Sequence, residues 1–197
     1  MVLPVVLLVF FALTRWPGLM PWNFSAAYGL AFCAGLYFTG SNRWIFPLLT
    51  LGLTDVLLNL YHGASVVNIF SVIALATFSV IIWMGSRFSS RWPWIVLVFG
   101  GMAGAIIFYI VTNTVSWLFD PAYAKTFAGW IQALTFGRPG LPATWEFFRN
   151  TLISGGLFTG LFAAAMKLTE PAEAEAKEGE DAIAEAPDGK PVVEPAK

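Results

Sequence analysis

Long apolar runs separated by short polar turns fill the first 167 residues of the chain. A helix needs about 20 mostly apolar residues to cross a bilayer. The runs therefore predict six transmembrane helices, at about 2–15, 24–40, 44–61, 65–86, 92–118 and 150–167. Only the tight connection YHGAS separates the third run from the fourth, so we expect these two helices to be antiparallel neighbours.

Two segments depart from this pattern. Between the fifth and sixth runs, apolar residues recur at helical spacing from Tyr123 to Leu134, which predicts an interfacial helix rather than another span. From residue 168 onward the chain is rich in Ala, Glu and Pro and contains no aromatic residue. Such a segment cannot bury enough apolar surface to fold alone. The sequence thus predicts a transmembrane helical domain, 1–167, and a disordered tail, 168–197.

The composition is that of an all-α, polytopic membrane protein. Hydrophobic residues make up 57% of the chain and charged residues 12%, with a mean hydropathy of +0.70. The membrane domain carries eight Arg and Lys against three Asp and Glu, whereas the tail carries three against nine. With the N-terminus inside, Arg43, Arg87 and Arg91 fall in inside loops, as the positive-inside rule favours. We therefore expect a compact bundle in the bacterial inner membrane, with both termini and the tail cytoplasmic.

Asp55 is the residue that most needs an explanation, because a carboxylate within a span costs about 3 kcal/mol. Asn59 lies one helical turn later on the same face. In the predicted topology, the other strongly polar residues also fall near the outer ends of the spans. Because these polar residues share a position near the outer surface, they predict a cavity in the outer leaflet that binds a small solute. Such a cavity is mostly apolar, with a few converging polar groups. We expect polar contacts from Asp55, Asn59, Asn113, Arg149 and Asn150, with Asn23 and Trp117 at the mouth.

Two structural roles compete with this prediction. In the first, Asp55 only pairs with Arg149 or caps a helix; in the second, the Asn side chains only join helices within the bilayer, as they often do. A separate pattern concerns small residues, which let helix backbones approach closely. Three such stripes are present, and they predict either packing within the bundle or docking on a partner subunit. Their members are Ala27, Ala31 and Gly35; Gly100 and Gly104; and Gly156 and Gly160.

Several kinds of chemistry are excluded by what the sequence lacks. A single cysteine, Cys33, and a single histidine, His62, cannot form a disulfide or a multi-His metal centre within one chain. The sequence contains no P-loop, no HExxH and no Gly-x-Ser-x-Gly. It therefore predicts no enzymatic activity, no cofactor and no metal site.

Four segments resemble an uncharacterised bacterial integral-membrane family grouped with the substrate-binding S components of energy-coupling-factor (ECF) vitamin transporters. They are NFSAAYGLAFCAGLYF, PLLTLGLTDVLLNLY, FYIVTNTVSWL and the segment from AKTFAGW to FTGLF, and the likeness extends from Asn23 to Ala165. It implies a six-helix S component with a vitamin-sized site near the outer face. It also implies partners, namely a transmembrane coupling subunit and ATPases. In S components a small-residue stripe on the first helix docks on the coupling subunit, whereas here the stripe falls on the second span.

Together, these features predict an S-component-like protein that captures a small, vitamin-like solute from outside. Uptake would then depend on partner energising subunits. A non-catalytic structural or accessory subunit of a larger membrane complex is the alternative, because the chain is small and lacks catalytic motifs. An intramembrane enzyme is a third possibility, but it would need more carboxylates within the spans than Asp55 alone.

Overall fold

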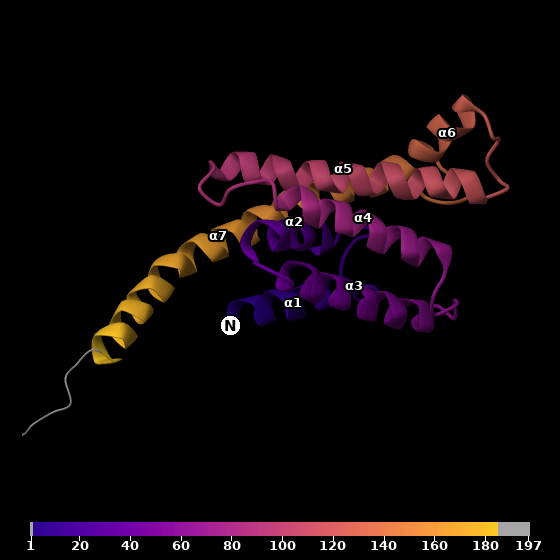
Figure 1. Cartoon of the computed structure of the whole chain (residues 1–197). Helices are drawn as coiled ribbons and strands as arrows, with labels where there is room; N and C mark the ends of the chain where they lie inside the picture. Colours follow the sequence, from indigo (N-terminus) through magenta and orange to yellow (C-terminus); the bar gives the residue numbers. More distant parts are fainter. Residues whose placement is uncertain (1, 185–197) are drawn as a thin grey trace, which may run out of the picture. The chain divides into compact units, whose positions relative to one another are not determined.

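The computed structural model describes residues 2–184, with side chains described for residue 6 and residues 9–168. The described chain is all-α, with seven helices and no strand (Figure 1). It divides into two units, Met1–Ala163 and Ala164–Lys197, of which the first is a helical bundle. The helices are α1 (Val2–Thr14), α2 (Ala27–Tyr37), α3 (Asn42–Tyr61), α4 (Ile69–Gly85), α5 (Trp94–Phe119), α6 (Phe127–Leu134) and α7 (Thr144–Ala184).

Every predicted span contains a helix, but three of the helices in the described part of the chain, not six, are long and apolar enough to cross a membrane. These are α3, α5 and the Thr144–Leu168 part of α7. α2 has 11 residues, or about 16 Å at 1.5 Å per residue, against about 30 Å of hydrocarbon. Apolar residues on both sides of α2 belong to its connections, where Asn23 and Gly40 adopt positive φ. Hydropathy alone therefore overestimated the length of this helix.

The short helix α2 forms the centre of the bundle. All nine residues from Ala27 to Gly35 are buried, as expected for a helix that is apolar on every side. α2 packs against α3, α4 and α5, and the backbone at Gly29 meets α7 at Phe158 and Thr159. α7 runs antiparallel to α5, since the Phe148 ring lies against Tyr109 and Gly160 lies against Trp94.

The small residues singled out in the sequence are all buried within the bundle. A Cβ on Gly35 would overlap the Ile82 carbonyl, so this glycine allows α2 and α4 to touch through their backbones. Gly100 faces the Phe32 ring and Gly104 faces Ile81. The same burial holds for Ala27, Ala31, Gly156 and Gly160.

The second unit differs from the predicted tail. α7 continues as a helix to Ala184, so residues 168–184, expected to be disordered, are helical in the structure. The physical reason is local, since Ala, Glu and Lys are strong helix formers even where they cannot build a core. The remainder of the predicted tail, residues 185–197, lies outside the described residues.

Candidate functional site

A half-open cavity of about 820 Å³ lies at the end of the bundle where α3 ends, α4 begins and α5 ends. Figure 1 shows these three helix ends on the same side as α6. The volume of the cavity is within the range of about 300–1,000 Å³ typical of small-molecule sites. The wall comprises the connection from α1 to α2 together with facing turns of α3, α4 and α5.

An ion pair lies in the wall of the cavity. Arg15 Nη2 is 3.2 Å from Asp55 Oδ1, and the two side chains are 16% and 22% exposed. Arg15 follows the last residue of α1, so the pair joins the start of the α1–α2 connection to α3. The carboxylate that the sequence placed within a span is therefore neutralised by Arg15 and not by Arg149.

Aromatic side chains form the inner part of the wall. Tyr28 is buried at the start of α2, and its ring packs edge-on against Phe108 with centroids 5.2 Å apart. Phe78 from α4 packs against Phe108 at 4.8 Å. Residues from α2, α4 and α5 thus form this aromatic cluster.

Amide side chains supply most of the other polar groups. Asn59 Nδ2 donates to Ser71 Oγ at 3.1 Å and to the Val66 carbonyl at 3.2 Å, which joins α3 to the start of α4. Asn113 Nδ2 donates to the Tyr109 carbonyl of its own helix at 2.8 Å. Because an amide also carries a carbonyl oxygen with two acceptor positions, Asn113 retains acceptor capacity for a ligand. Asn23 lines the cavity as well.

Three residues predicted for the site lie elsewhere. Arg149 is exposed and lies over the Trp145 ring, with Cζ 5.5 Å from the centroid. Positions two apart on a helix face nearly opposite ways, and it is Thr151 that is buried. Asn150 Nδ2 donates to the Trp22 carbonyl at 2.9 Å, so it positions the cavity wall without lining the cavity. Trp117 Nε1 donates to the Ala124 carbonyl at 2.8 Å, beyond the cavity.

Two charged or titratable residues that line the cavity, Arg15 and His62, were absent from the predicted site. Arg15 had a usable signal. It is the one basic residue expected on the outer side among the first five predicted spans, and Asp55 is the one acidic residue there. His62 lies in the short YHGAS connection, where it is exposed and also lines the cavity.

The α5–α7 connection adopts a folded structure next to the cavity-bearing end of α5. The segment predicted to be interfacial contains α6, and Thr126 caps it by accepting from the Gly129 N–H. Arg138 Nη1 lies 3.2 Å from Asp120 Oδ2. Burial and the nearby Asp120 carboxylate raise the pKa of Tyr123 above its ordinary value.

Tyr109 links this connection to the bundle. Its hydroxyl donates to the carbonyls of Leu134 and Thr144. We expect Tyr109→Phe to lower the free energy of unfolding by about 1–3 kcal/mol, because two carbonyls lose a shared donor. Faster amide hydrogen exchange across residues 127–145 would report the loosening. The control Tyr61→Phe changes an exposed tyrosine, and unchanged exchange in Tyr109→Phe would contradict the assignment.

The described residues contain no group of three or more His, Cys, Asp or Glu side chains placed to hold a metal ion.

The model of DUF6580, a family of unknown function, matches residues 1–177. No curated protein and no solved structure matches the chain.

Proposed function

The chain belongs to this family of unknown function, and we propose that it is an S-component-like membrane protein that binds a small solute in the 820 Å³ cavity. Uptake of the solute then requires partner energising subunits. The observation that carries the proposal is the cavity itself, in which an ion pair, several amides and an aromatic cluster converge at one end of an apolar bundle. This combination is typical of small-molecule sites.

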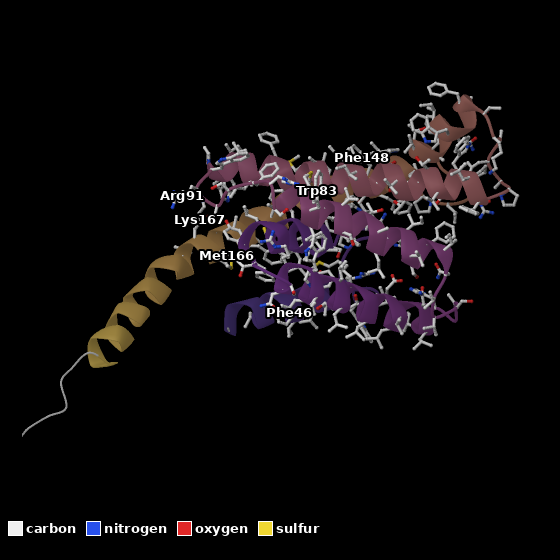
Figure 2. All side chains as sticks on the ribbon, in the orientation of Figure 1. Phe46, Trp83, Arg91, Phe148, Met166 and Lys167 are labelled. Atoms are coloured by element: carbon white, nitrogen blue, oxygen red, sulfur yellow. The ribbon has the colours of Figure 1, made fainter. Side chains whose placement is uncertain are left out.

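The distribution of charge supports an outward-facing cavity. Arg43 lies beside the α2–α3 connection, and Arg87 and Arg91 lie between α4 and α5, at the opposite end of the bundle from the cavity. Figure 2 labels Arg91 at this end, away from α6. Because basic residues accumulate on the cytoplasmic side, the cavity opens outward and both termini are cytoplasmic. In this arrangement α1–α5 and α7 form the six-helix membrane bundle, in which the shorter helices lie among three full spans.

The lining favours a solute with an apolar part and no net charge. Phe78, Phe108 and Tyr28 offer ring faces and edges, and aromatic partners at this spacing each contribute about 0.5–1.5 kcal/mol beyond burial. Arg15 and Asp55 neutralise each other, so the wall attracts neither anions nor cations as a class. Asn59 and Asn113 provide directional hydrogen bonds that orient a polar edge.

Partner docking must use a different surface from the one that the resemblance implies. Ala27 and Ala31 lie in the centre of the bundle, where a second subunit cannot reach them. The exposed apolar side chains of α3 and α4 offer a surface of suitable chemistry, and Figure 2 labels two of them, Phe46 and Trp83. The chain has no nucleotide-binding motif, so transport energy comes from partners in this proposal.

Native mass spectrometry of the protein purified from its host membrane tests the proposal. We expect a retained small molecule, with a lower occupancy in Asn113→Leu because its affinity falls about tenfold, which corresponds to ~1.4 kcal/mol and about one hydrogen bond. Asn42→Leu is the matched control, because Asn42 is an exposed amide at the opposite end of the bundle. Equal occupancy in both variants would reject the site. An empty protein held stoichiometrically in a larger complex would favour an accessory subunit.

A further inference from the structure

A second, smaller cavity runs between α1 and α3. It has a volume of about 230 Å³, and its surface is almost wholly apolar. We call it the side groove. It is lined by Val9, Ala12, Leu13, Arg15, Trp16, Pro17, Thr54, Leu57, Leu58 and Tyr61.

The side groove adjoins the main cavity. Both are lined by Arg15, Trp16, Pro17 and Leu58, so these four residues form a shared boundary between a polar space and an apolar one. The centroids of the Trp16 and Tyr61 rings are 6.2 Å apart at the outer side of the groove. A molecule that crossed the boundary would have a polar part beside the Arg15–Asp55 ion pair and an apolar part between α1 and α3.

The side groove faces the surroundings of the bundle rather than its core. Leu13 and Leu57 are each 56% exposed and form its edges. α3 is one of the three helices long and apolar enough to span a membrane. Within a bilayer, this surface is therefore in contact with lipid chains, and a chain can enter the groove sideways without crossing water.

The charged residues of the main cavity restrict the charge that the head group of such a molecule can carry. Among the described residues that line the cavity, Arg15 carries the positive charge and Asp55 the negative one, with His62 and Tyr28 as further titratable groups. The ion pair joins Nη2 to Oδ1. A guanidinium has five donor positions and a carboxylate can accept about four bonds. A head group with one negative and one positive charge can therefore bind beside the pair without breaking it.

We infer that the solute is a single-chain zwitterionic amphiphile, whose head occupies the main cavity and whose chain lies in the side groove between α1 and α3. This inference rests on the proposed function, because it assigns the chemical class of the ligand of that same cavity. It also explains why a cavity with paired charges adjoins an almost wholly apolar groove.

Binding of lysophosphatidylethanolamine to the full chain in phosphatidylcholine nanodiscs tests the inference. Glycerophosphoethanolamine, which has the same head and no chain, is the comparison probe. We expect the lysolipid to bind at least about tenfold more tightly, and a photoreactive chain to crosslink to residues of α1 and α3. Leu57→Trp should fill the side groove and weaken the lysolipid about tenfold, with little effect on the head alone.

Leu53→Trp is the matched control. Leu53 lies one turn before Leu57 on α3, is 57% exposed against 56%, and lines neither cavity. Equal binding of the two probes, or equal weakening by both Trp variants, would overturn the side-groove assignment. Equal binding of lysophosphatidylglycerol, which carries a net negative charge, would overturn the zwitterionic head. None of these results contradicts the main cavity as the solute site. If Asn113→Leu weakened the binding of neither probe, the main cavity would be rejected as the binding site.

Discussion

Gly85→Ala is expected to lower the free energy of unfolding by about 3 kcal/mol, at the upper end of the usual cost of overpacking a core. A Cβ at position 85 would overlap the carbonyl of Phe32, and a Cβ at Gly35 would overlap the carbonyl of Ile82. Both obstructing atoms belong to backbone, so neither moves unless α2 and α4 separate. The midpoint of thermal unfolding in one defined detergent, followed by tryptophan fluorescence, measures the effect.

Gly52→Ala is the control for this prediction. Gly52 also lies within a helix, but an added Cβ there has no heavy atom within 4 Å. Replacing a helical glycine by alanine gains up to about 1 kcal/mol of helix propensity, so this variant should unfold at the same or a higher temperature. If Gly85→Ala and Gly52→Ala unfold at the same temperature, the α2–α4 backbone contact is not as close as the structure places it.

The contrast between Gly35 and Gly85 shows how far the sequence could predict packing. Gly35 ends a stripe with Ala27 and Ala31, and a repeat of this kind is visible along one chain segment. Gly85 stands alone at the end of α4 and belongs to no repeat. Its importance arises from the backbone that faces it on another helix. Local patterns therefore predicted the helices and one side of the contact, but not the pairing.

The sequence predicted at which end of the bundle the polar residues lie, but not which of them face the cavity. Residues Asp55, Asn59 and Asn113 lie at the predicted end of the bundle and line the cavity there. Arg149 belongs to the same end, but the first turns of α7 bury Thr151 instead and leave Arg149 exposed. Hydropathy gives the position of a residue along a span, whereas the side it faces depends on how helices rotate against each other.

The Arg15–Asp55 pair gives the second large expected effect. We expect Asp55→Leu or Arg15→Met alone to lower the free energy of unfolding by about 2–4 kcal/mol, because each leaves an uncompensated charge in a largely buried position. The double variant should recover most of this loss, since apolar residues of similar volume often replace such a pair at little cost. Thermal unfolding of the four proteins in one detergent completes the double-mutant cycle.

The Arg138–Asp120 pair is the natural comparison, because its nitrogen–oxygen distance is also 3.2 Å but its arginine is 51% exposed. Exposed ion pairs contribute about 0–1 kcal/mol, so Arg138→Met should have a small effect that salt weakens further. Additive losses in the Arg15–Asp55 cycle would mean that the two charges are solvated independently. The cavity would then present two separate charges, and a ligand with a single charge would fit it as well as a zwitterion. A coupling energy well above that of the exposed pair would establish the neutral wall on which both proposals for the ligand depend.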